Sequence, residues 1–248
     1  MNERAVSEAI GFIIILGIVM SGIGLVTLYG YPVLVKEQSN TDVRNMERAM
    51  IVIQNDMKSL CFKNVPYKET TLQVSGGTLE VINATSYGGF INVTNGTTLF
   101  QNNYPVGALV YRSDRGTEVI TLENGAVITR QEDAAGSAML AEPRWFYDET
   151  TKTFAVYIMN ITTDEAMARS GVATVRMSLE GVVTNVSSSP GGEEITVIYE
   201  SDTSNDNSVA WGNYLTGSLG MERSDDGYTL QGVTRLVIKE YRIRIHGI

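Results

Sequence analysis

The sequence has very little of the side-chain chemistry that most enzymes use. Its 248 residues include one cysteine, Cys61, and one histidine, His246. A single cysteine excludes an intrachain disulfide, and it neither requires nor excludes export. A lone histidine so close to the end of the sequence is more often structural or exposed than catalytic, and no glycine-rich phosphate-binding loop follows a predicted strand. We therefore expect a protein that is not an enzyme and carries no cofactor.

Positive charge is also scarce. The chain has 19 Lys and Arg residues against 28 Asp and Glu residues, a net charge of −9. Nucleic-acid binding needs clustered Lys and Arg, so this composition argues against a nucleic-acid partner. Carboxylates are the ligands that calcium prefers, but the spacing of the loop acids does not fit an EF-hand, so solvated carboxylates are the better interpretation. These acids are Asp202, Asp206, Asp225 and Asp226.

One long stretch lacks charge altogether. The 27 residues between Glu8 and Lys36 read AIGFIIILGIVMSGIGLVTLYGYPVLV. About 20 apolar residues span a bilayer as a helix, and a helix satisfies its own backbone there. A secretory signal peptide has an apolar run of only about 7–15 residues before a cleavage site, and Gly30-Tyr31-Pro32-Val33 is a poor site. The stretch therefore predicts a helix that enters a membrane.

The helical pattern continues beyond Lys36. Apolar residues recur at steps of three and four, as on one face of a helix, at Val43, Met46, Met50, Ile53, Met57 and Leu60. Proline removes a backbone hydrogen bond and usually kinks a helix, so we expect a kink at Pro32. We predict one long helix over residues 6–62, apolar all round over 6–35 and amphipathic over 36–62. Cys61 is expected to be a small buried residue beside this seam, the alternative being a redox or intermolecular thiol.

Small residues punctuate the apolar half of this predicted helix, at Gly11, Gly17, Ser21, Gly22 and Gly24. Glycine weakens a helix by about 1 kcal/mol relative to alanine. In return, small residues let helices approach closely in apolar surroundings. We interpret these positions as helix-packing sites. The alternative is that glycine is simply more frequent in membrane helices.

The start of the chain combines a short polar leader, MNERA, with the segment Val6–Gly11. The motif RAVSEAIG resembles the RAVSPVIG motif of archaeal type IV pilins and pilin-like surface proteins, with Glu8-Ala9 in place of Pro-Val. The resemblance covers about the first 60 residues. It implies that residues 1–5 are a leader removed by a prepilin peptidase, which would recognise Arg4-Ala5 and leave Val6 as the new N-terminus. The alternative is a plain signal anchor.

Glu8 is the charge at the N-terminal edge of the apolar run. A carboxylate in this position is costly unless it is paired. By the resemblance, Glu8 would pair with the free amine of Val6 on a neighbouring subunit. The alternative is a carboxylate in the membrane interface, where negative charge near a helix N-terminus is favourable.

From Lys63 onwards the sequence changes to short alternating apolar segments separated by turn residues. The clearest strands are 108–112, 117–123 and 126–130, and Asn124-Gly125 is a strong type I′ hairpin signal. We also expect hairpin turns at Ser75–Gly77 and at Glu180-Gly181, and a short helix over Ser208–Gly217 capped by Ser208. The predicted fold is α+β: a long helix, then an all-β, sandwich-like head over 63–248. The head is either one sandwich or two stacked lobes with a boundary near 136–143.

Five Asn-x-Ser/Thr sequons lie in the predicted head, at Asn83, Asn92, Asn95, Asn160 and Asn185. Glycans are bulky and solubilising and belong on exported surface segments, so these are candidates for N-glycosylation. The alternative is chance, because a domain rich in Thr and Asn produces such triplets readily.

Together these features predict a structural subunit of an extracellular pilus-like filament. The chain would be inserted in the membrane before assembly, processed by a prepilin peptidase and handled by pilus assembly machinery. Identical copies would then bundle their helices into a core, with β heads outside. The alternative is a membrane-anchored surface protein for binding or adhesion that does not polymerise. An anchored exoenzyme is the least supported class, because no nucleophile–base pattern is present.

Overall fold

A computed structural model describes the backbone of residues 3–63, 65–95 and 98–248, and the side chains of 10–63, 65–95 and 103–248. The chain divides into two compact units, one ending at Asp42 and one spanning Val43–Ile248, which we call the head. Each unit is described here by itself.

The chain begins with a helix that is continuous through three segments, α1 (Glu3–Leu25), η1 (Val26–Gly30) and α2 (Tyr31–Lys63). The middle segment is a single π-helical turn, in which the Tyr31 N–H bonds to the Val26 carbonyl five residues back. The expected irregularity therefore falls one turn before Pro32. The proline ring excludes the carbonyl four residues earlier, and a wider turn at that place accommodates the ring.

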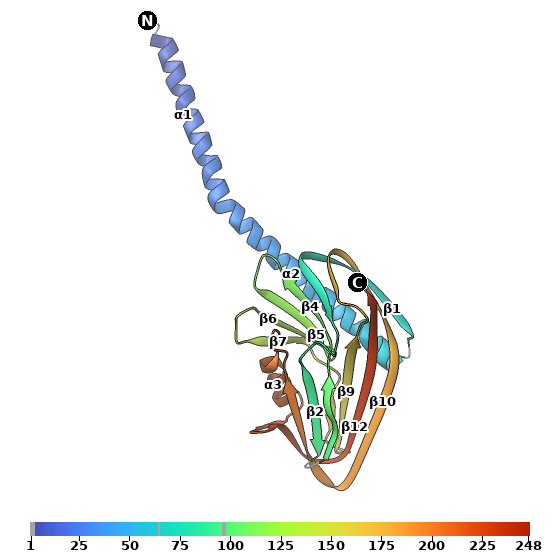
Figure 1. Ribbon diagram of the computed structural model, residues 1–248. Helices are drawn as coiled ribbons and strands as arrows, with labels where there is room; N and C mark the ends of the chain where they lie inside the picture. The colour runs from blue at the N-terminus through green and yellow to red at the C-terminus, as the bar shows by residue number, and fades with distance from the viewer. Residues whose placement is uncertain (1–2, 64, 96–97) are drawn as a thin grey trace. The chain divides into compact units, whose positions relative to one another are not determined.

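The head is a β-rich domain (Figure 1). Its strands are β1 (Tyr67–Ile82), β2 (Phe90–Asn95), β3 (Thr98–Pro105), β4 (Ala108–Ser113), β5 (Glu118–Glu123), β6 (Ala126–Gln131), β7 (Ser137–Ala141), β8 (Phe146–Asp148), β9 (Thr153–Thr162), β10 (Met167–Glu200), β11 (Glu222–Ser224) and β12 (Gly227–Gly247). One further helix, α3, covers Ser208–Gly217. The α+β class with a β-rich head is confirmed.

All the strands belong to one connected sheet of order β7-β6-β5-β4-β1-β10-β12-β9-β8, with β2–β3 added at β10 and β11 at β12. Among the described strands every pairing is antiparallel except that of β12 with β9, which is parallel. Ile195 and Val197 of β10 pack in one cluster with side chains of β2, β3, β4, β9 and α3, so the sheet folds back on itself. This gives the head its sandwich-like character.

The other face of the sheet is covered by residues 43–63 of α2. The predicted seam lies here: Met46, Met50, Ile53, Met57 and Leu60 are all fully buried in one cluster with the sheet. Gln54 adds direction to the packing, because its side-chain amide donates to the carbonyls of Gly125 (2.6 Å) and Glu142 (3.0 Å). The amphipathic half of the helix thus finds its partner within its own chain.

Two predicted hairpins are wrong, because the chain runs straight through both. Strand β1 continues past Ser75–Gly77, where Gly76 adopts a φ of +62° and the register with β10 shifts. Strand β10 continues past Gly181 and through the Ser187–Gly192 segment, pairing with β12 on both sides of each irregularity. A bulge of the G1 type uses the same left-handed glycine as a tight turn, as Gly76 does here, so residue type alone does not separate them.

Three other expectations concern the Asn124-Gly125 turn, the interruption near 136–143 and helix α3. The type I′ turn is confirmed, since Asn124 and Gly125 have φ values of +45° and +74°. The interruption expected near 136–143 is instead strand β7, paired with β6 inside one compact head. Helix α3 has the predicted bounds, but Ser208 is its first residue, and the Asp206 carboxylate accepts the Ser208 N–H at 3.0 Å.

Candidate functional site

The most unusual surface of the described chain is the apolar segment Ile10–Leu34. Its large apolar side chains are between 44% and 71% exposed, from Leu16 to Tyr29. The helix is long and apolar enough to cross a bilayer once, and none of its most apolar window is buried within the chain. Soluble proteins rarely leave a contiguous apolar surface of this size uncovered. This segment therefore requires cover from outside the chain.

The hydroxyls of Ser21 and Thr27 on this surface make their hydrogen bonds within the helix. The Ser21 hydroxyl donates to the Gly17 carbonyl (2.8 Å), and the Thr27 hydroxyl donates to the Ile23 carbonyl (2.9 Å). A hydroxyl satisfied by its own helix carries no further demand for water. The segment can therefore lie in lipid or among other apolar helices.

The predicted helix-packing residues fall on two faces of α1. At about 100° per residue, Gly17, Ser21 and Gly24 lie on one side, and Gly11 and Gly22 lie together on another. A methyl group placed on any of these four glycines would meet nothing within 4 Å. At these positions the helix surface has little side-chain bulk, so a second helix could approach its backbone closely.

The predicted cleavage residues and Glu8 fall at the start of α1. The backbone of Arg4, Ala5, Val6 and Glu8 is helical. Their side chains lie outside the described residues, so the processing site and the subunit charge pair stay predictions.

The sequons lie in different surroundings within the head. Asn83 follows β1, Asn92 and Asn95 lie in β2, and Asn185 lies in β10, all partly exposed. Asn160 in β9 is only 6% exposed, so the folded head has no room for a glycan there. The Asn95 amide also donates to the Glu193 carboxylate (2.7 Å), which occupies the nitrogen that a glycan would need. The Asn83 amide donates in the same way to the Thr163 carbonyl, so Asn92 and Asn185 remain the better candidates.

The other chemistry-bearing residues hold the head together. The Cys61 thiol is buried, and burial raises its pKa to about 12, which suits the expected structural role. Nε2 of His246 on β12 lies 2.8 Å from the hydroxyl of Ser178 on β10. Asp202 accepts the N–H groups of Gly88 and Ser204. Within the described residues no group of three or more His, Cys, Asp or Glu side chains could hold a metal ion.

Sequence reasoning missed one buried carboxyl group. Glu123, at the end of β5, is fully buried and accepts hydrogen bonds from the hydroxyls of Tyr87 (2.5 Å) and Tyr199 (2.7 Å) and from the Trp211 indole (2.7 Å). Burial raises the pKa of the Glu123 carboxyl, and the donated hydrogen bonds oppose that rise. A glutamate before an Asn-Gly turn looks like an ordinary solvated residue, so only its distant donors identify it.

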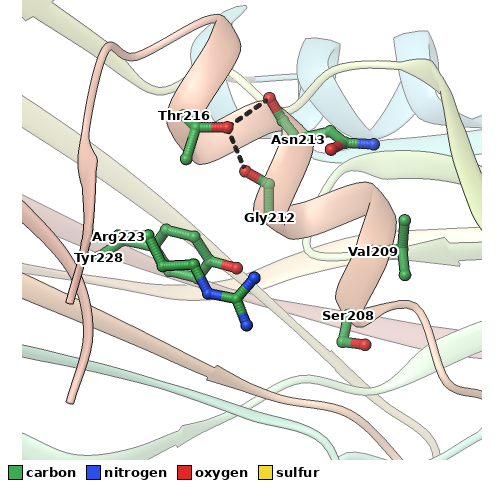
Figure 2. A pocket seen from close by; sticks show the side chains of 7 residues that line it. All are labelled: Ser208, Val209, Gly212, Asn213, Thr216, Arg223 and Tyr228. Atoms are coloured by element: carbon green, nitrogen blue, oxygen red, sulfur yellow. Dashed lines mark hydrogen bonds between the residues drawn. The ribbon is translucent and has the colours of Figure 1, made fainter. Parts of the chain in front are cut away.

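A small pocket of about 240 Å³ lies between α3 and the β11–β12 hairpin. Figure 2 shows Arg223 and Tyr228 on the side of the pocket opposite Gly212 of α3, and Asn213 of α3 also lines the pocket. A side chain at Gly212 would meet the Tyr228 hydroxyl, since its Cβ would lie 2.5 Å from that oxygen. The pocket offers a guanidinium, a phenol hydroxyl and a carboxamide, which are groups that bind small anions or sugar hydroxyls.

These features define a class: α+β proteins with one uncovered N-terminal apolar helix and a β-rich head. The chain belongs to a family of unknown function, DUF7289, whose match covers residues 4–245. It is 24% identical over 188 residues to an uncharacterized protein of Archaeoglobus fulgidus. The alignment covers 61% of this chain and 61% of the length of that relative. No solved structure matches the chain.

Proposed function

We propose that this protein is a structural subunit of an extracellular pilus-like filament, in which the apolar helices of many copies form the core and the heads lie outside. The carrying observation is the uncovered apolar surface of residues Ile10–Leu34. Burying such a surface contributes about 25 cal/mol per Å² removed from water. Identical helices from other copies provide cover of the same chemistry as lipid.

The glycine faces of α1 favour helix bundling over a solitary anchor. A helix that touches only lipid gains nothing from Gly17 and Gly24, which weaken it by about 1 kcal/mol each. In a bundle, the same residues let neighbouring backbones approach closely. The motif RAVSEAIG supports the same proposal through its resemblance to archaeal type IV pilins. Processing before Val6 and pairing of Glu8 with the new amine belong to this proposal.

The direct test is to shear surface material from the native organism, image it by negative stain and sequence the N-terminus of the chain in it. We expect uniform fibres that contain this chain and a protein that starts at Val6. A protein found only as a monomer in the membrane, still starting at Met1, would overturn the proposal.

A variant separates assembly from membrane insertion. Gly17→Leu makes the helix more apolar and more helix-favouring, so insertion should be retained, but its bulk should block close packing. We expect fibre yield to fall while the amount in the membrane stays unchanged. Ile18→Leu, which keeps side-chain volume at a neighbouring exposed position, is the matched control and should assemble normally. Equal fibre yields from both variants would count against packing through Gly17.

A second candidate is a membrane-anchored surface protein that binds a ligand without polymerising. The donor-lined pocket beside α3 favours it, because it lies in the head and makes no use of helix bundling. The two candidates differ in one variant: Arg223→Ala should abolish ligand binding in the second and leave fibres unchanged in the first. Binding can be measured on the full chain with a panel of uronic acids and inorganic phosphate.

A further inference from the structure

One edge of β10 is left open in the middle of the sheet. Strand β1 pairs with β10 as far as Ser178, and β2 pairs with it again from Ile195. Both lie on the edge opposite β12, because Arg176 and Ile195 each pair with β12 as well. Between them, from Leu179 to Glu194, none of the described strands pairs with this edge. Figure 1 shows the long strand β10, which contains this stretch, beside β12.

Open edges usually carry protection against pairing with other chains, in the form of charges, prolines or bulges. Here the residues from Gly181 to Gly192 include no charged side chain, and protection is confined to Pro190 and the irregularity after Ser188. Other margins of the sheet differ. Strand β11 carries Glu222 and Arg223, and α3 lies against β7. The unprotected part of the β10 edge is therefore Gly181–Ser188.

On one face of this stretch, valines stand two residues before and two residues after Thr184. Val182, Thr184 and Val186 alternate along the strand and share one face of the sheet. Val182 and Val186 are 47% and 52% exposed, although each pairs with β12, which lies inside the sheet. An antiparallel copy centred on Thr184 would place Val182 opposite Val186 and Thr184 opposite itself. Valine pairs and threonine pairs are favourable neighbours across strands.

We propose that the β10 edge Gly181–Ser188 pairs antiparallel with the same edge of a second copy of this chain, joining two heads through one continuous sheet. Charge favours this occupant. In a chain of net charge −9, most contacts between identical surfaces bring like charges together, and this uncharged stretch does not. The pairing uses the head alone, so it does not depend on whether the helices form a filament. It does require that the Asn185 sequon, which lies within this stretch, carries no bulky glycan.

Cysteine cross-linking of the full chain in detergent tests the pairing and its register. The only native cysteine, Cys61, is buried, so it should not contribute to cross-linking. Thr184→Cys should give a disulfide-linked dimer on mild oxidation, because the two residues face each other. Thr174→Cys is the matched control: Thr174 lies on the same strand but is already paired with Thr71 of β1, so it should give no such dimer.

The register makes a sharper demand. A mixture of Val182→Cys and Val186→Cys proteins should form disulfide-linked dimers. Either variant oxidised alone should give a much lower dimer yield. Dimers from Val182→Cys alone would overturn the antiparallel arrangement, and a Thr184→Cys yield no higher than that of Thr174→Cys would overturn the pairing itself.

A charge substitution gives an independent readout. Thr184→Lys should abolish head-to-head association in sedimentation experiments, because two like charges would then lie opposite each other. Val172→Lys is the control, since Val172 is also exposed, at 59%, but pairs with Gln73 of β1. Tryptophan fluorescence verifies that both variants are folded. Association of Thr184→Lys at the wild-type level would overturn the proposal, whereas failure of Gly17→Leu to affect fibres would leave it standing.

Discussion

The two halves of the N-terminal helix solve the same problem in opposite ways. Residues 43–63 of α2 carry most of their apolar residues on one face and bury them against the head's own sheet, with Met50 and Ile53 fully buried. Residues 10–34 are apolar on every face and leave Met20 62% exposed. An amphipathic pattern can be satisfied within one chain, whereas an apolar cylinder needs lipid or other copies. The four predictions below test this difference, from the largest expected effect to the smallest.

The same substitution should have two different consequences in the two halves. Met50→Lys places a charge in the sheet–helix core and should prevent the head from folding, since unpaired buried charges are among the most destabilising changes. Met20→Lys should leave the head folded and cost about 2.5–3.5 kcal/mol of membrane insertion. Fluorescence of Trp145 and Trp211, both in the head, reports folding. Membrane fractionation reports insertion. Loss of head folding in Met20→Lys would contradict the comparison.

Polar anchoring should also belong to one half only. Gln54→Ala removes both hydrogen bonds to the Gly125 and Glu142 carbonyls and should lower the free energy of unfolding by about 1–3 kcal/mol. Gln38→Ala is the control, because Gln38 is exposed and should change stability by less than about 0.5 kcal/mol. Urea denaturation of the full chain in detergent measures both. Equal effects would mean that Gln54 does not dock the helix.

The head should show a pH dependence of its own. Because burial raises the pKa of Glu123 above its ordinary value of 4.5, the folded state binds this proton more tightly than the unfolded state. Its contribution to stability is therefore greatest below pH 4.5 and is lost as the pH rises through the raised pKa, by at most about 1.4 kcal/mol per pH unit. Glu123→Gln should flatten this part of the stability profile. An unchanged slope in the variant would exclude Glu123 as its source.

The smallest effect is expected for the ion pair that joins α2 to β1. Lys68 lies 3.0 Å from Asp56, with 34% and 21% of the two side chains exposed. Removing Lys68 with Lys68→Ala should cost less than about 1 kcal/mol, because solvent screens a partly exposed pair. The same urea titration, repeated at high salt, should show the difference shrinking. A larger or salt-independent loss would indicate that Lys68 packs rather than pairs.

Local patterns in the sequence predicted the local structure well. The steps of three and four from Val43 to Leu60 defined the buried seam, and Asn124-Gly125 defined the tight turn between β5 and β6. Helix α3 has its predicted bounds because its apolar face is short and bounded by turn residues. Each of these features depends on residues that are close in the chain.

Long-range structure could not be predicted in the same way. Gly76 and Gly181 suggested hairpin turns, but tertiary pairing with β4 and β12 keeps β1 and β10 continuous through them. The parallel contact of β12 with β9 joins segments that no local signal connects. Glu123 was missed for the same reason, since Tyr87, Tyr199 and Trp211 approach it from distant segments. The apolar helix was predictable, while the processing site and Glu8 pairing stay predictions.

The position of β12 has a consequence for biogenesis. This strand is the last of the head in chain order, yet it lies between β10 and β9 inside the sheet. Until β12 has been synthesised, no strand joins β9 to β10, and the sheet stays divided into two parts. We therefore expect the head to remain unfolded during most of its synthesis, which is the state that export of the head under the proposed function would require.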